Sequence, residues 1–423
     1  MEKYSRMHLF QGYGIELEYM IVDRDTLNVK PIADELMKQM AGKYVEDYVN
    51  GSVTWSNELV LHVIELKCTE PTKDLIQLNK DFEANIVLIN DVLKLFNAKL
   101  MPTAAHPWMN PATDTFLWPH GNSEVYEKYD SIFDCRGHGW SNLQSTHLNL
   151  PYYDDEEFAK LHAATRVILP LIPALAASSP ILDGKNTGVL DKRMVYYGQN
   201  QKVIPSIVGK IIPERVNSKR QYHKLIYDKI ENDVKPYNSN GILNPVWVNS
   251  RGAIARFDRG SLEIRITDIQ ECPMADLAIA TVIIHLLKML VKEKLSSYDH
   301  QYQQETDYLA SVLQGTIVRG GDYRIDNKSY LQSLGIDEDE EMTINEVWKA
   351  ILCKVIEEYP DAMAPWVSTL DLMLTEGNLS QRILEVTNDI YTTNNLKMIY
   401  QELSENLVNN QLFVKNETVP YNS

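Results

Sequence analysis

Four short segments of the chain alternate apolar side chains with polar ones, mostly acidic, which is the pattern of a β-strand with two different faces. They are residues 14–19, 61–67, 145–150 and 261–267. In the first segment, Glu16 and Glu18 point to one face and apolar residues point to the other. Carboxylates gathered on one side of a sheet repel one another, and divalent cations relieve that repulsion. The pattern predicts an antiparallel sheet with one apolar and one acidic face.

The two later segments add other functional groups to this face. His147 shares its face with Ser145, and Glu263 shares its face with Arg265 and Thr267. For any one strand, the solvated face of an antiparallel sheet is the simpler interpretation. Solvated faces mix Lys, Thr, Gln and Glu, however, whereas these positions are mostly short acids with one His and one Arg. The four segments together favour a divalent-metal site that handles phosphate.

Composition limits the partners of the protein. The net charge of the 423-residue chain is −17, which argues against a nucleic-acid partner because a phosphate backbone requires surplus Lys and Arg. A small anionic substrate held by a metal and a few arginines remains compatible with this charge. The four cysteines stand far apart without a CxxC motif, so free thiols in a reducing compartment are expected rather than a structural zinc site.

Nothing in the sequence indicates export or membrane insertion. Residues 1–12 lack an apolar core, so no signal peptide is expected. The apolar stretches 167–182 and 278–291 are shorter than a membrane-spanning helix. We expect both to be buried helices and the protein to be cytoplasmic, with no membrane partner. The sequence leaves the oligomeric state open, and a homo-oligomer is compatible with it.

The order of the predicted elements indicates an α+β fold. Strand-like segments are scattered through residues 10–270 and separated by long helices, which favours one interleaved catalytic domain at 1–295. A mainly helical part at 296–414 is expected to pack on it, followed by a disordered tail at 415–423. Expected local features are helices from Thr72 onward, at 155–177 with a bend near Pro170, at 218–234 and at 274–295, a capping box at Thr343 and Glu346, irregular segments at 101–118 and 183–212, and a solvated loop at 337–341.

The chain has no P-loop, no GxGxxG and no GxSxG motif, so any nucleotide must bind through metals and scattered basic residues. Five motifs occur in one order, and together they resemble glutamate–cysteine ligase and the related carboxylate–amine ligases. The resemblance implies a glutamine-synthetase-like fold, in which a curved antiparallel sheet forms a metal-lined funnel. ATP phosphorylates a carboxylate there, and an amine attacks the acyl phosphate. The motifs are residues 14–18, Glu58 with Glu65, residues 146–149, residues 192–194 and residues 262–268.

Residue by residue, the resemblance assigns roles within this chain. Arg265 matches the catalytic arginine that contacts the transferred phosphate, and Arg193 matches an arginine on the substrate or nucleotide side, which makes it a candidate for cofactor binding. The positions that match metal ligands are Glu16, Glu18, Glu58, Glu65, His147 and Glu263.

Three features depart from this pattern. Glu58 and Glu65 have opposite parity, so one straight strand cannot present both to one face and a bend or bulge is required. Imidazole is an unusual ligand for Mg2+, so His147 contacts either a metal, with Mn2+ as an alternative ion, or a phosphate. Ser145 stands where many bacterial relatives carry a second histidine.

These residues predict an ATP- and Mg2+-dependent ligase that joins the γ-carboxyl of glutamate to the amine of cysteine, an activity connected with glutathione biosynthesis. One alternative is a ligase of the same fold with another amine or acid. The other, from a different class, is a non-catalytic divalent-metal-binding or regulatory protein.

Overall fold

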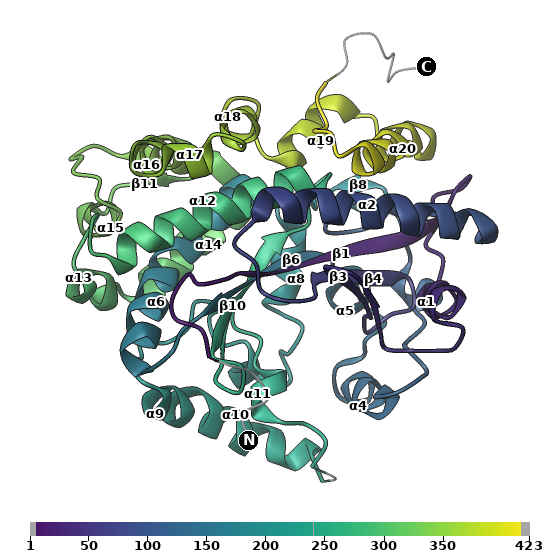
Figure 1. Cartoon of the computed structure of the whole chain (residues 1–423), viewed down its shortest axis with the longest axis horizontal. Helices are drawn as coiled ribbons and strands as arrows, with labels where there is room; N and C mark the ends of the chain where they lie inside the picture. The colour runs from purple at the N-terminus through teal and green to yellow at the C-terminus, as the bar shows by residue number, and fades with distance from the viewer. Residues whose placement is uncertain (1–5, 240, 416–423) are drawn as a thin grey trace.

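The computed structural model describes residues 6–239 and 241–415 and forms a mixed α/β fold around one large antiparallel sheet (Figure 1). The sheet confirms the predicted antiparallel pairing, because the registered strand pairs in it run antiparallel. Across the sheet the strands are β2 (Asp47–Asn50), β3 (Val53–Asn57), β4 (Val63–Cys68), β1 (Gly14–Asp23), β6 (Ser145–Pro151), β10 (Ser261–Asp268) and β9 (Ala253–Arg256), and β5 (Ala98–Met101) pairs with β1.

One face of the sheet is apolar and packs against two long helices, α2 (Leu75–Leu93) and α12 (Pro273–Val291), which also contact each other. Leu17 of β1 and Leu148 of β6 belong to the main hydrophobic core on this face. In Figure 1, α2 and α12 lie on one side of the strands, and α4 (Ser123–Phe133), α10 (Asp228–Val234) and α11 (Pro245–Val248) lie on the other. The acidic side chains face the second group of helices, since the charge of Glu58 acts on Tyr126 of α4.

Two helical stretches, Asp155–Ala176 and Pro273–Val291, are long and apolar enough to cross a membrane by length and composition. Within the fold, however, 94% and 83% of their apolar windows are buried. A helix that is apolar on all sides is expected in the interior of a large domain. Both are therefore core helices of this fold, as the sequence predicted.

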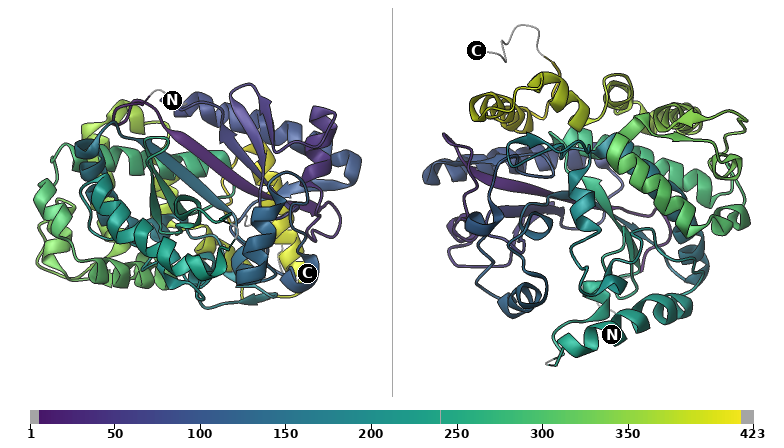
Figure 2. Two further views of the ribbon diagram at one scale, coloured as in Figure 1. Left: turned by 90° about the horizontal axis from the view of Figure 1, so that it is seen from below. Right: turned by 180° about the vertical axis from the view of Figure 1, so that it is seen from behind.

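Three of the C-terminal helices, α16, α18 and α20, pack against α2 or α12. Contacts join α16 and α18 to α12, and α20 to both α2 and β5 (Figure 2). The division of the chain at residue 295 stays a prediction, and residues 416–423 of the predicted tail lie outside the described part. The helices are α13 (Tyr298–Gln303), α14 (Thr306–Arg319), α15 (Lys328–Ser333), α16 (Ile344–Glu358), α17 (Pro360–Met363), α18 (Val367–Thr375), α19 (Leu379–Thr387) and α20 (Thr393–Asn409).

Several local predictions are confirmed. Thr343 and Glu346 form the capping box that opens α16. The expected bend lies at Pro170, where a 3-10 turn at Leu169–Leu171 separates α6 (Asp155–Ile168) from α7 (Ile172–Ala176). Proline causes this break because it lacks the N–H that a continuous helix requires. The acidic loop 337–341 is exposed.

Two local predictions are wrong. The helix expected from Thr72 onward begins only at Leu75, because its N-cap is Asp74, whose side chain accepts the N–H of Gln77 at 2.9 Å. The segment 183–212 is not wholly irregular, because it contains α8 (Lys192–Tyr197). Asp191 caps that helix by accepting the N–H of Met194, a local signal that could have been read from the sequence.

Candidate active site

Neighbouring strands bring the predicted metal-binding side chains to one face. Glu18 of β1 lies opposite Glu65 of β4, and Glu16 lies opposite His147 of β6. Glu263 follows on β10, which pairs with β6. Because directly opposed residues of an antiparallel pair share a face, the register gathers side chains that are far apart in the sequence. We call Glu16, Glu18, Glu58, Glu65, His147 and Glu263 the acidic cluster.

Glu58 joins the cluster from the connection between β3 and β4. β3 ends at Asn57 and β4 begins at Val63, so Glu58 and Glu65 belong to different elements. The connection between the two strands is the bend that allows Glu58 and Glu65 to reach the same face despite their opposite parity. Burial and the nearby charge of Glu18 raise the pKa of Glu58 to about 7, which reflects how close the two carboxylates lie.

The acidic face is buried, not solvated. Glu18, Glu65, His147 and Glu263 are between 5% and 8% exposed. Burying several carboxylates together is costly unless cations or hydrogen bonds compensate them. The interpretation of these strands as an ordinary solvated sheet face is therefore wrong.

His147 stands at the centre of the cluster. Its Nδ1 atom lies 2.8 Å from Oε2 of Glu16, and its Nε2 atom lies 3.0 Å from Oγ of Ser145. Although burial alone would raise the pKa of Glu16, the hydrogen bond and charge of His147 lower it to about 2. Ser145 also donates from its N–H and its hydroxyl to Oε2 of Glu18, at 2.7 and 2.9 Å.

Glu65 is buried close to the carboxylates of Glu16, Glu58 and Glu18. Burial, followed by the charge of Glu16, raises its pKa well above the ordinary value. Lys67, two residues further along β4, partly offsets this with Nζ at 3.3 Å from Oε2 of Glu65. Lys67 is shared, however, because its Nζ also lies 3.1 Å from Asp47. Lys67 therefore offsets the repulsion at Glu65 only in part.

The donor geometry fits a divalent cation. One ligand atom each of Glu16, Glu65 and His147 lies within 4.8 Å of the others. Two carboxylates and an imidazole at this spacing can coordinate one ion, and carboxylate oxygen is the ligand that Mg2+ and Mn2+ favour. The assignment of all six cluster residues as metal ligands stays a prediction.

Arg265 lies beside the cluster, at a bulge in β10. Its Nε atom is 3.1 Å from Oε1 of Glu263, and its side chain is 27% exposed, so the guanidinium is accessible to a ligand. The register of β10 against β6 shifts between Ile264 and Thr267, which inserts one extra residue in β10. The N–H of Arg265 donates instead to the carbonyl of Gly252. A Cβ on Gly252 would lie 2.7 Å from the side chain of Ile266, so this close approach requires glycine.

The bulge corrects one expectation from the sequence. Thr267 was expected to share the face of Glu263 and Arg265. It pairs with Thr146, whose hydroxyl donates to Asp276 of α12 at 2.5 Å, and so it lies on the helix-covered face. An extra residue reverses the alternation of side chains along a strand.

Arg193 is buried behind the same bulge. Its side chain is 2% exposed and pairs with Asp268 through Nε. Its Nη1 atom lies 3.4 Å from the carbonyl oxygen of Arg265. Burial disfavours its charge, but Asp268 and then Asp191 outweigh burial and raise its pKa. These contacts support a role in positioning Arg265, and the predicted contact with a nucleotide stays a prediction.

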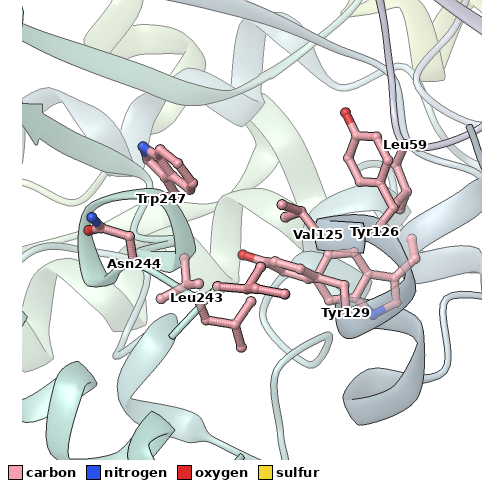
Figure 3. Close-up of a pocket in the computed structure, with 10 residues that line it drawn as sticks. Leu59, Val125, Tyr126, Tyr129, Leu243, Asn244 and Trp247 are labelled. Atoms are coloured by element: carbon pink, nitrogen blue, oxygen red, sulfur yellow. The ribbon is translucent and has the colours of Figure 1, made fainter. Parts of the chain in front are cut away.

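An aromatic pocket of about 210 Å³ lies beside the connection that carries Glu58 (Figure 3). It lies between α4, which supplies Tyr126 and Tyr129, and the segment of α11, which supplies Trp247. Leu59, the residue after Glu58, also lines it. No pattern in the sequence indicated this pocket, because its two walls are more than a hundred residues apart in the chain.

Sequence reasoning also missed several residues that serve the cluster. Lys67 could have been found, because it has the same strand parity as Glu65. Arg256, whose Nη1 lies 3.5 Å from Oε2 of Glu263, could not, since it comes from the neighbouring strand β9. Asn149, at the end of the motif 146–149, also serves the cluster, because its Nδ2 donates to Oε1 of Glu16 at 3.1 Å.

The chain is similar to proteins of a known family. Residues 13–401 match the family model described as glutamate-cysteine ligase family 2. Over 404 residues the chain is 31% identical to an uncharacterized protein of Archaeoglobus fulgidus, an alignment that covers 95% of this chain and 100% of that protein. A protein of Bradyrhizobium diazoefficiens named "Putative glutamate--cysteine ligase 2" is 23% identical over 360 residues, which cover 82% of this chain and 72% of that protein.

A solved structure shares the fold. The glutamate–cysteine ligase of Francisella tularensis, determined in complex with AMP, superimposes with a TM-score of 0.58 over 96% of this chain and 90% of that chain. Its sequence identity is 13%, so the likeness concerns the fold alone.

Proposed function

Because the chain belongs to the glutamate–cysteine ligase family 2, we propose that it is an ATP-dependent ligase that joins the γ-carboxyl of glutamate to an amine through an acyl phosphate. The observation that carries this proposal is the buried acidic cluster with the accessible guanidinium of Arg265 at its edge. Cysteine is the acceptor that the family name supplies, and it is the reference amine of the assay below. The AMP complex of the Francisella tularensis ligase supports nucleotide binding in this fold.

The acidic cluster would bind the cation that phosphoryl transfer from ATP requires. Glu16, Glu65 and His147 would hold a divalent cation, with the other carboxylates around them. When bound, such a cation would supply charge neutralisation for phosphate oxygens. Mg2+ is the first candidate and Mn2+ the second, because both prefer carboxylate ligands.

In this proposal Arg265 binds the phosphate that is transferred. Its planar guanidinium can hold two oxygens at once, and Glu263 at 3.1 Å fixes its orientation. A γ-carboxylate oxygen of glutamate attacks the γ-phosphorus of ATP, and ADP leaves with the electrons of the broken P–O bond. The amine then attacks the acyl carbon, phosphate leaves, and the nitrogen loses a proton as the amide forms.

The test is release of ADP and phosphate from ATP and Mg2+ in the presence of glutamate and a panel of amines that includes cysteine. Release is expected to require both glutamate and an amine, and the product mass should equal their sum minus water. Hydroxylamine in place of the amine should trap the acyl phosphate as γ-glutamyl hydroxamate.

A matched pair of variants ties the activity to the cluster. Glu16→Gln should lower turnover by orders of magnitude, whereas Glu156→Gln should not, because the Glu156 side chain on α6 is 77% exposed and does not belong to the cluster. Binding of Mn2+ without phosphate release for any acid or amine would reject the ligase and favour the non-catalytic metal-binding or regulatory protein.

The location of the protein belongs to the same proposal. ATP and glutamate are cytoplasmic substrates, and the four cysteines are free thiols. Free cysteines are typical of reducing compartments. We therefore assign the reaction to the cytoplasm, a point that fractionation of cells with an antibody to the protein would test.

A further inference from the structure

Building on the proposed ligase reaction, we propose that the acceptor amine carries a bulky apolar side chain, and that this side chain occupies the aromatic pocket between α4 and α11 (Figure 3). The inference rests on the proposed function and names the chemical class of its second substrate.

The pocket borders the residues that would carry the chemistry. Leu59 in its wall directly follows Glu58. Asn57, just before Glu58, donates from Nδ2 to the hydroxyl of Tyr126 at 3.1 Å. Burial, followed by the nearby charge of Glu58, raises the pKa of Tyr126 to about 12. The pocket therefore adjoins the connection that carries Glu58, and in this proposal a group bound to the acyl carbon extends from the cluster into it.

The size of the pocket exceeds what cysteine requires. An engineered apolar cavity of ~150 Å³ is large enough to hold benzene, and this pocket has about 210 Å³. A side chain with the dimensions of a phenyl or branched aliphatic group would fill it. A thiol on one methylene would leave most of the volume to water and lose the contacts that give affinity.

The lining of the pocket disfavours an acceptor with a charged side chain. The residues that line the pocket are apolar or aromatic apart from Asn244, and none of them is Asp, Glu, Lys or Arg. A charged side chain buried there would lack a partner. Trp247, at 58% exposure, offers a large aromatic surface that a ligand would cover.

The competing occupant is the adenine base of ATP. A buried purine needs partners for its polar edge. Among the polar groups of this lining, Oδ1 of Asn244 already accepts the N–H of Val246 at the start of α11, and the Tyr126 hydroxyl already accepts from Asn57. Nε1 of Trp140 is buried without a partner, but an indole N–H is only a donor and cannot serve the amino group of adenine. The pocket thus suits an apolar side chain better than a purine.

The experiment compares amino acids of increasing apolar size, from alanine through cysteine and leucine to phenylalanine, in the phosphate-release assay with ATP, Mg2+ and glutamate. Each methylene that fills an apolar pocket changes kcat/KM by roughly tenfold or more. We expect phenylalanine or leucine to exceed alanine by at least about a hundredfold, and to exceed cysteine.

Two variants that change the pocket in opposite ways, one by filling it and one by opening it, keep the test independent of folding failures. Val125→Phe fills the pocket and should lower kcat/KM for phenylalanine by about tenfold or more while alanine is unaffected. Trp247→Ala removes one wall and should weaken all bulky acceptors. Phe116→Ala is the control, because Phe116 is 52% exposed and lines a different surface hollow. Quenching of tryptophan fluorescence by phenylalanine, without ATP, gives a binding readout that does not depend on turnover.

Distinct outcomes separate the two proposals. A preference for cysteine over the larger amines would overturn the pocket assignment and leave the ligase standing. So would a Val125→Phe variant with a raised KM for ATP and unchanged amine selectivity, which would assign the pocket to the base. Absence of phosphate release with every amine would reject the ligase, and this inference with it.

Discussion

His147 and Glu16 face each other across strands β6 and β1, and the Nδ1 atom of the imidazole lies 2.8 Å from Oε2 of the carboxylate. The same imidazole contacts Ser145, whose hydroxyl donates to Glu18. Four side chains on two strands therefore form one connected hydrogen-bond network. Residues coupled in this way respond together to substitution, because removing one member leaves another buried group without its partner.

Neutralising either glutamate of β1 should disable the enzyme. Glu16→Gln and Glu18→Gln each remove one negative charge while preserving shape, so turnover should fall by orders of magnitude and the Mg2+ requirement should rise. Steady-state rates across a Mg2+ titration measure both effects, with Glu156→Gln as the exposed control. Near-normal turnover of both variants at modest Mg2+ would show that the pair does not bind the cation.

Arg265→Lys should remain folded and bind nucleotide but react slowly. Lysine keeps the charge and loses the bidentate geometry. An interaction made mainly in the transition state lowers kcat more than it raises the KM for ATP. The loss of one such contact costs on the order of 3 kcal/mol, or about a hundredfold in rate. Melting and turnover should be measured on one preparation, and a destabilised but fully active variant would make Arg265 only a structural partner of Glu263.

Arg193→Met should destabilise the protein. The substitution leaves Asp268 buried without its partner, and breaking a buried ion pair in this way costs about 3–5 kcal/mol. The melting temperature should fall by about 5 °C for a chain of this length. Arg136→Met is the control, because Arg136 is 51% exposed. An unchanged melting temperature with a raised KM for ATP would instead support the nucleotide contact predicted from the sequence.

Stability should fall in acid because of His162. Burial, followed by the charge of Arg166, lowers the pKa of His162 to about 3, whereas a histidine in the unfolded chain titrates near 6.5. Between these values the unfolded state binds more protons than the folded state. The contribution of His162 is therefore complete above pH ~6.5 and is lost as the pH falls toward 3, by about 1.4 kcal/mol per pH unit.

Denaturant unfolding at pH 7, 6 and 5 measures this slope. In His162→Phe the dependence of the unfolding free energy on pH should be shallower by one proton, because phenylalanine does not titrate. The variant should still fold, since its ring can pack against Phe158 and Tyr222 as the imidazole does. His8→Asn, at a side chain that is 53% exposed, should keep the wild-type slope. Identical slopes for His162→Phe and the wild type would show that His162 does not govern acid stability.

The sequence by itself determined which side chains of a strand share a face. Glu16 with Glu18, and Glu65 with Lys67, follow from the two-residue period of extended backbone, which is a local property. The break at Pro170 and the capping box at Thr343 were likewise predictable, because their causes lie within a few residues. Five motifs in order were also sufficient to indicate the family.

Only the tertiary structure decided which strands pair, in which register, and where the alternation fails. The bulge in β10 turns Thr267 away from the site, although the two-residue alternation counted from Glu263 predicts that Thr267 faces the site. Asp268, the next residue, pairs with Arg193. The aromatic pocket joins Tyr126 to Trp247 across more than a hundred residues of chain. The physical reason is that register, bulges and pockets are set by hydrogen bonds and packing between distant segments, whereas side-chain parity is set by the backbone of each segment alone.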